Sequence, residues 1–109
     1  MKGSLHKGRE FQSVYDKSCS RANRFVVMYV AKNGLTENRI GVVASKKIGN
    51  SVVRHRVRRL IREGLRQNGA RFNTGLDLIV IARRTCVGRT QAEITEAVLQ
   101  VAGLHGIMK

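Results

Sequence analysis

The order of apolar and polar positions predicts a chain of mixed helices and strands. Apolar side chains recur at helical spacing within 7–16, which favours a short helix. Valine and aromatic residues are frequent in 25–31, a composition typical of a strand. The polar turn that follows contains Asn33-Gly34, and 39–45 is the next predicted strand. Because so short a segment joins the two strands, we expect them to pair as an antiparallel hairpin.

The longest predicted helix spans 51–67. Its apolar residues fall on one face at helical spacing and arginines fill the opposite side, which is the pattern of a helix that packs on a core. Asn50 or Ser51 can cap the first turn with a side-chain oxygen. We expect Asn68-Gly69 to end this helix, because glycine commonly follows the last helical turn.

One strand and one helix complete the predicted fold. The near-continuous apolar run at 76–82 suits a buried central strand, and a last helix over 91–103 has Thr90 as its expected cap. The order helix, hairpin, helix, strand, helix predicts a single α+β domain over 1–109, with its helices packed on one sheet. The strand–helix–strand unit from 39–45 to 76–82 would ordinarily be right-handed.

The net charge adds a function class to this fold. Lysine and arginine total 21 against 7 acidic residues, giving a formal charge of +14. Nine of these basic residues lie between Lys46 and Arg71, where Glu63 is the only acid. Such clustering favours a binding surface for a polyanion, and nucleic acid is the expected partner. An anionic membrane surface and a general effect on solubility are the alternatives.

Four arginines, here called the arginine row, are spaced four residues apart along the predicted helix: Arg54, Arg58, Arg62 and Arg66. This spacing places them on one side of the helix, where like charges repel and Glu63 offsets only part of the repulsion. A phosphate backbone would neutralise such a row. Lys46 and Lys47 precede the helix, whose first N–H groups also favour an anion. The alternative is a solvated helix face.

The remaining reactive side chains show no catalytic or metal-binding pattern. We expect Cys19 and Cys86 to be free thiols, because neither belongs to a ligand spacing and a disulfide is the less favoured alternative. His6 and His105 are expected at the surface. Asp77 and Glu96 are interpreted as isolated acids, so no acid–base pair is predicted.

The sequence also bears on location. The first 15 residues carry several charges and no apolar run, which argues against a secretory signal. No stretch approaches the roughly 18 apolar residues of a membrane span. We therefore expect a cytoplasmic protein with no membrane partner.

One run of residues resembles a known signature. Residues 45–63 read Ser-Lys-Lys-Ile-Gly-Asn-Ser-Val-Val-Arg-His-Arg-Val-Arg-Arg-Leu-Ile-Arg-Glu. This run closely resembles the signature of the bacterial ribonuclease P protein component. The resemblance extends to Arg9-Glu10-Phe11 with Tyr15, to Ala22-Asn23-Arg24 and to 77–83, and so covers nearly the whole chain. His55 stands where the family has asparagine, so a role that needs an amide there is in doubt, and a tolerated variant is the simpler interpretation.

The resemblance implies a fold and a function. The fold is a two-layer α+β sandwich of the ribosomal protein S5 domain 2-like type, whose strand–helix–strand crossover is left-handed. The function is that of the RNA-binding subunit of ribonuclease P, an endoribonuclease that removes the 5′ leader of precursor tRNA. In this family the RNA carries the hydrolysis with Mg²⁺, no organic cofactor takes part, and the protein is not expected to cleave RNA alone. One protein is expected per catalytic RNA.

The resemblance also implies two sets of site residues. Contacts to the catalytic RNA are implied for Lys46, Lys47, Asn50, Arg54, His55 and Arg56. A leader-binding cleft between the sheet and the first helix is implied for Phe11, Tyr15, Tyr29, Arg58, Arg59, Arg62 and Arg66. Aromatic rings can stack on unpaired bases of any sequence.

Several alternatives stay open at this point. Phe11 is equally well interpreted as a core residue, and Asn23 and Arg24 either contact RNA or only shape a turn. A ribosomal subunit or an RNA chaperone would fit the charge equally well, and only the ordered motif argues against it. An independent nuclease lacks a catalytic cluster, and a membrane-surface helix lacks Trp and Phe on its apolar face.

Overall fold

Five strands and three α-helices make up the part of the chain that the computed structural model describes, residues 3–5 and 8–109. His6, predicted to lie at the surface, falls outside this part. The strands are β1 (Gly3–Ser4), β2 (Cys19–Ala22), β3 (Val26–Lys32), β4 (Arg39–Val43) and β5 (Leu76–Ala82). The helices are α1 (Gly8–Lys17), α2 (Ser51–Gln67) and α3 (Gln91–His105), with short 3-10 helices η1 (Gly69–Arg71) and η2 (Arg84–Cys86).

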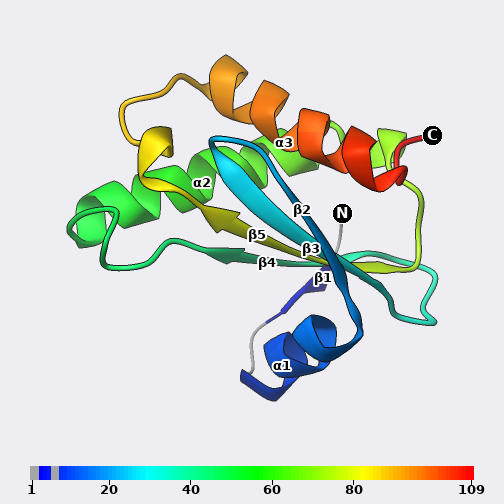
Figure 1. The fold of residues 1–109 in the computed structure, drawn as a ribbon. Helices are drawn as coiled ribbons and strands as arrows, with labels where there is room; N and C mark the ends of the chain where they lie inside the picture. Colours follow the sequence, from blue (N-terminus) through cyan, green and yellow to red (C-terminus); the bar gives the residue numbers. More distant parts are fainter. Residues whose placement is uncertain (1–2, 6–7) are drawn as a thin grey trace.

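The strands form one sheet in the order β1-β4-β5-β3-β2. Helices α2 and α3 cover one face of this sheet, and α1 lies against the other (Figure 1). The predicted α+β class and the predicted order of the main elements are confirmed. The bounds of α2 and β5 agree with the prediction, and α3 continues two residues beyond it.

The predicted hairpin between β3 and β4 is wrong. Strand β5 lies between them, parallel to β4 and antiparallel to β3. The physical reason is that β5 is apolar on both faces and gains most from a central position, where helices cover both sides. The connection that follows β3 crosses the start of β5, where Asn33 donates its backbone N–H to Gly75 and the Asn38 side chain accepts from the Leu76 N–H.

Two edge strands were not predicted. Strand β2 pairs with β3, and all four of its residues are exposed, so it carries no alternation of apolar and polar positions. Strand β1 has only two residues, which pair with the start of β4. Backbone pairing alone makes these strands, and a hydrophobic pattern cannot reveal them.

The sheet divides the apolar side chains into two clusters. The larger lies between the sheet and helices α2 and α3, and Ile61, Leu78 and Ile94 are fully buried in it. The smaller lies under α1 and contains Val14 and Ile79. Because alternate residues of a strand point to opposite faces, β5 contributes to both clusters.

Side-chain caps define where the two long helices begin. The Asn50 side-chain oxygen accepts the Val53 N–H at 3.0 Å, so Asn50 rather than Ser51 is the cap of α2. Thr90 caps α3 as predicted, and the structure adds a reciprocal hydrogen bond to the Glu93 side chain, which was not predicted. Helix α2 ends before Asn68-Gly69 as predicted, but Gly69 starts η1, and the Asn68 side chain donates to the Gly64 carbonyl instead.

Candidate nucleic-acid interface

The start of α2 presents cations close to its first backbone N–H groups. Lys46 and Lys47 are exposed in the loop that leads to the Asn50 cap, and His55 and Arg56 are exposed on the first turns of the helix. Arg54 is half-buried, and its buried Nε has no hydrogen-bond partner among residues 3–5 and 8–109. The set of residues predicted to contact the catalytic RNA therefore gathers at one end of one helix.

The arginine row continues along α2. Arg66 forms two hydrogen bonds with Glu63, and this contact raises the pKa of the guanidinium and lowers that of the carboxyl. Arg58 and Arg62 form no ion pair within the described part of the chain. The row therefore keeps most of its charge available for a ligand.

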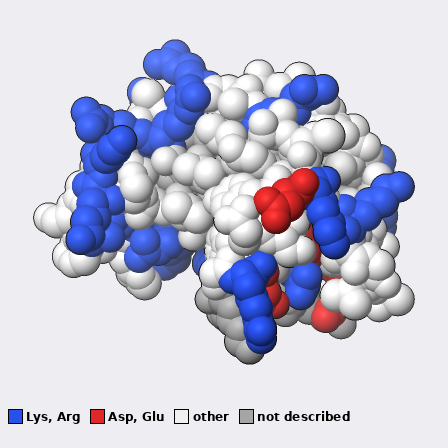
Figure 2. Space-filling view, turned by 60° about the horizontal axis from the view of Figure 1, so that its bottom comes forward, with Lys and Arg blue, Asp and Glu red and all other residues white. Residues whose placement is uncertain are grey.

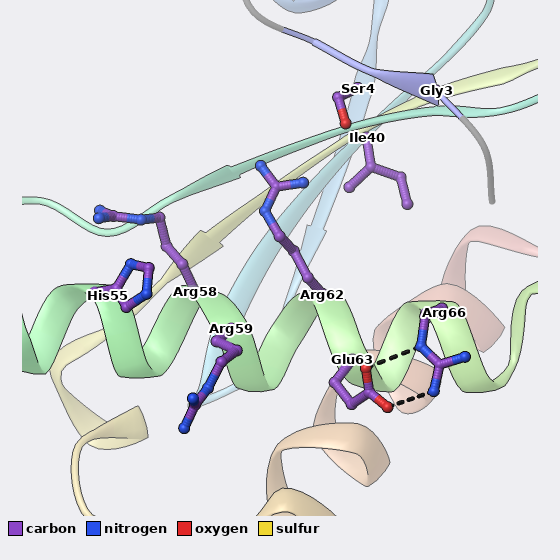
Figure 3. Close-up of a pocket in the computed structure, with 9 residues that line it drawn as sticks. All are labelled: Gly3, Ser4, Ile40, His55, Arg58, Arg59, Arg62, Glu63 and Arg66. Atoms are coloured by element: carbon purple, nitrogen blue, oxygen red, sulfur yellow. Dashed lines mark hydrogen bonds and ion pairs between the residues drawn. The ribbon is translucent and has the colours of Figure 1, made fainter.

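A pocket of about 420 Å³ lies between α2 and the edge of the sheet. Its walls are Gly3, Ser4, Ile40, His55, Arg58, Arg59, Arg62, Glu63 and Arg66. In Figure 3, Arg62 points from the helix toward Ser4 and Ile40, whereas Arg59 points away from the strands. The pocket is basic on its helical side and has one carboxylate, which Arg66 already binds.

Phe11, Tyr15 and Tyr29 meet on the opposite face of the sheet, beside α1. The rings of Tyr15 and Tyr29 contact edge to face with centroids 4.8 Å apart, and burial and then the Tyr29 charge raise the pKa of Tyr15. Phe11 packs over Gly41, since an added Cβ at Gly41 would lie 2.5 Å from the ring. All three rings are half-buried, so Phe11 belongs to the small core and is also partly open to solvent.

An apolar strip continues from these rings along the sheet. Val43, Ile81 and Val27 lie side by side in the register of β4, β5 and β3, and each is half-buried. They point to the same face as Tyr29, because they lie two residues along the strands from the row of Gly41, Ile79 and Tyr29. The rings and this strip together form a partly exposed apolar surface beside α1, here called the aromatic face.

Helix α1 is attached to the sheet by an ionic network. Arg39 donates two hydrogen bonds to Asp77, at 2.8 and 2.7 Å, and contacts Glu10 of α1 at 3.3 Å. Burial raises the pKa of Asp77, but the hydrogen bonds from Arg39 and Asn33 outweigh it and hold this pKa below its ordinary value. Asp77 is therefore not the isolated acid that the sequence suggested. A buried carboxylate is stable there because it is paired.

The residues predicted for the leader cleft fall into two groups. Phe11, Tyr15 and Tyr29 lie together on the aromatic face, whereas Arg58, Arg59, Arg62 and Arg66 line the pocket on the other side of the sheet. The apolar side of α2 packs on that other side, so its arginines follow it there. The structure does not bring the two groups into one cleft wall.

Asn23, whose role the sequence left open, and His105, which was expected at the surface, both contact distant parts of the chain. The Asn23 side chain accepts the N–H groups of Phe25 and Val26 and donates to the Ala97 carbonyl, which shapes the turn and joins it to α3. His105 is half-buried, with Nε2 2.8 Å from the Met28 carbonyl, so the predicted surface histidine is only partly exposed and is held by a backbone contact. This contact between α3 and β3 was not visible in the sequence, because 77 residues separate the partners.

Among the arginines outside α2, Arg24 was considered from the sequence as a possible RNA contact, whereas Arg84 was missed. Arg84 donates from Nε to the Lys47 carbonyl at 3.2 Å, which joins η2 to the loop before α2. Figure 2 shows Lys and Arg gathered along the left side of the molecule, the end at which α2 begins, next to an uncharged surface. By contrast, α3 contains neither Lys nor Arg. The charge is therefore concentrated at one end and on one helix.

The described residues hold no group of three or more His, Cys, Asp or Glu that could bind a metal ion. Within the same ranges, no helix combines the length and the hydropathy of a membrane span. Cys19 and Cys86 are free thiols, as predicted. Together, the fold and these surfaces define a basic α+β protein suited to binding a nucleic acid backbone.

Comparisons with known proteins identify the family. The model of the Ribonuclease P family matches residues 1–104. The ribonuclease P protein component of Lachnoclostridium phytofermentans is 47% identical over 108 residues, which cover 99% of this chain and 93% of that protein. The corresponding protein of Alkaliphilus oremlandii is 42% identical over 97 residues, 89% of this chain and 85% of that one. The chain belongs to the ribonuclease P protein family, the protein components of an endoribonuclease.

Solved structures agree with the fold. The RNase P protein of Staphylococcus aureus superposes with a TM-score of 0.90 at 31% identity over 100% of both chains. The RNase P protein of Thermotoga maritima gives 0.85 at 26% identity, covering 93% of this chain and 96% of that one. Superposition cannot match a mirror-image connection. The agreement therefore extends to the β4–α2–β5 crossover, which the family resemblance implies is left-handed, against the ordinary rule.

Proposed function

We propose that this protein is the RNA-binding subunit of ribonuclease P and assists the removal of the 5′ leader from precursor tRNA. The observation that carries this proposal is the arginine row on α2. Within the described part of the chain, Arg58 and Arg62 of this row form no ion pair. The chain also belongs to the ribonuclease P protein family. An unpaired row of guanidiniums is unfavourable in the free protein, and a phosphate backbone relieves it.

The catalytic RNA binds at the start of α2 in this proposal. Lys46 and Lys47 are exposed there, and Asn50 places the first N–H groups of the helix beside them. Arg54, His55 and Arg56 continue the surface for one turn. A helix N-terminus and clustered cations attract the same phosphate groups, so their effects add.

The 5′ leader of the substrate lies on the aromatic face. Tyr15, Tyr29 and Phe11 offer ring edges and faces, and the half-buried strip beside them is uncharged. Base stacking on such rings contributes about 1–3 kcal/mol per base with little sequence preference. Arg58, Arg59, Arg62 and Arg66 then contact RNA backbone at the margin of this path, since they do not line the aromatic face itself.

The chemistry belongs to the RNA partner in this proposal. Mg²⁺ held mainly by that RNA activates water for phosphodiester hydrolysis, with no organic cofactor. The protein positions the substrate and screens phosphate repulsion, which lowers the Mg²⁺ concentration needed. One protein per catalytic RNA, working in the cytoplasm, completes the proposal.

The test is cleavage of a precursor tRNA by a bacterial ribonuclease P RNA at low Mg²⁺, with and without this protein. We expect cleavage at the mature 5′ end only when both are present, and none with protein alone. A double variant, Arg58→Ala with Arg62→Ala, should bind the RNA more weakly and with a shallower salt dependence. Unchanged affinity and salt dependence would refute the role of the arginine row.

A different RNA-binding role is the alternative outcome. If the protein binds the RNA but never stimulates cleavage, a general RNA-binding function of the ribosomal or chaperone type takes its place. His55→Asn, which restores the family residue at an exposed position, is then the first variant to measure.

A further inference from the structure

A second group of cations lies at the end of the sheet where β5 ends and β3 begins. Arg24 comes from the turn before β3, and Arg83, Arg84 and Arg89 follow β5. Arg24, Arg83 and Arg84 are exposed, and Arg89 is half-buried. None of the four belongs to α2, and more than fifty residues of sequence separate Arg24 from the others.

Backbone contacts hold the segments of this group together. The Arg83 N–H donates to the Phe25 carbonyl at 2.9 Å, and the Thr85 hydroxyl donates to the Arg24 carbonyl at 2.6 Å. Arg89 donates from Nε to the Thr85 carbonyl at 3.1 Å. The arginines therefore extend from a braced surface rather than from a free loop.

Two of the guanidiniums share one aromatic ring. The Arg24 and Arg89 guanidinium carbons lie 5.1 and 5.3 Å from the centroid of Phe25. Glu93 contacts Arg89 at 3.4 Å and is the only carboxylate that pairs with this group within residues 3–5 and 8–109. The ring and the single carboxylate orient the cations but do not neutralise them.

The group is continuous with the start of α2. Arg84 reaches the Lys47 carbonyl through Nε, and its Nη groups have no protein partner among the described residues. Figure 1 shows η2, in yellow, beside the start of α2 at the same end of the molecule. A guanidinium that is already held by its Nε loses less freedom when its remaining N–H groups bind phosphate.

We propose that Arg24, Arg83 and Arg84, with Lys47, form a second site for an RNA phosphate backbone that extends the surface at the start of α2 across the end of the sheet. The inference rests on the proposed RNA-binding function and adds three arginines that lie outside the run 45–63. The backbone belongs either to the catalytic RNA or to the precursor tRNA, because the chemistry of recognition is the same for both.

The test is a double variant, Arg83→Gln with Arg84→Gln, which removes two charges and keeps a polar side chain with the same carbons through Cδ. Its control is Lys32→Gln with Lys109→Gln, which removes two exposed charges away from this site. Affinity for a ribonuclease P RNA is measured from 50 to 200 mM salt. Two lost phosphate contacts reduce the salt slope by about two, so the loss of affinity should be roughly tenfold larger at 50 than at 200 mM salt.

The outcomes separate the two sources of backbone. Weaker binding to the ribonuclease P RNA alone supports the catalytic RNA. Unchanged binding there, with a raised KM of the reconstituted enzyme for precursors with both long and one-nucleotide leaders, supports the tRNA. If neither changes, or if the control pair shows equal losses, the second site is overturned. Arg58→Ala with Arg62→Ala, which tests the proposed function, can still weaken binding in that case.

Discussion

Replacing Gly41 with alanine should test whether Phe11 is held in place by its contact with the sheet. The added Cβ would lie 2.5 Å from Cζ and 2.6 Å from Cε1 of the Phe11 ring. Carbon atoms pack at about 3.5–4.0 Å, so the ring has to move outward by about 1 Å. Val14 and the Arg39–Glu10 contact continue to hold α1 on the sheet, so the ring moves more easily than the helix.

The expected loss of stability is small, and the expected loss of function is larger. Overpacking lowers the free energy of unfolding by about 1–3 kcal/mol. The lower end of this range applies, because Phe11 is half-buried and only the tip of its ring collides with the added Cβ. A loss of about 1 kcal/mol lowers the Tm of a domain of this size by about 4–8 °C. If the displaced ring loses one stacked base, about 1–3 kcal/mol of leader binding disappears.

Two measurements check this reasoning. Thermal unfolding of Gly41→Ala gives the stability, and KM for precursors with long and one-nucleotide leaders gives the leader contribution. We expect a raised KM for the long leader only. Adding Phe11→Leu to Gly41→Ala should restore the Tm, because leucine has no ring to collide, but should not restore leader binding. The account is refuted if Gly41→Ala keeps the stability and the leader dependence of the wild type. It is also refuted if the double variant is no more stable than Gly41→Ala.

Three further predictions concern stability, charge and reactivity. Asn50→Ala should lower the free energy of unfolding by about 1 kcal/mol, because the cap of α2 is lost. Asn50→Asp should keep that stability yet weaken RNA binding, so equal RNA affinities would contradict the placement of phosphate there. Asp77→Asn should lower the free energy of unfolding by roughly 2–3 kcal/mol. This loss is below the usual range for breaking a buried ion pair, because Arg39 is partly exposed. Because the pKa of Asp77 is lowered on folding, the wild-type advantage is complete above the ordinary value of 3.8 and is lost as the pH falls through the folded-state pKa. Urea titrations of the wild type and of Asp77→Asn from pH 7 to 3 measure the difference in free energy of unfolding. A difference that stays constant over this pH range would count against the ion pair. Finally, a thiol reagent should label exposed Cys19 in the native protein, whereas burial raises the pKa of Cys86 and delays its labelling until unfolding. Equal labelling rates would contradict this.

Elements that depend on local signals were predictable from the sequence alone. Helix α2 and strand β5 have the predicted bounds, and Asn50 and Thr90 cap their helices. Each signal acts within a few residues: a side-chain oxygen bonds an N–H three positions on, and apolar spacing selects a helix or a strand. The arginine row is equally local, because four-residue spacing on a helix decides which side chains align.

Only the tertiary structure decided how these elements combine. Strand β5 separates β3 from β4 because it is apolar on both faces, and the short turn between them could not show this. The same packing puts α1 and α2 on opposite faces, which parts the aromatic face from the arginines of α2. It also brings Arg84 to Lys47, and Glu10 and Asp77 to Arg39. Contacts of this kind depend on burial summed over the whole sheet, which no local stretch of sequence contains.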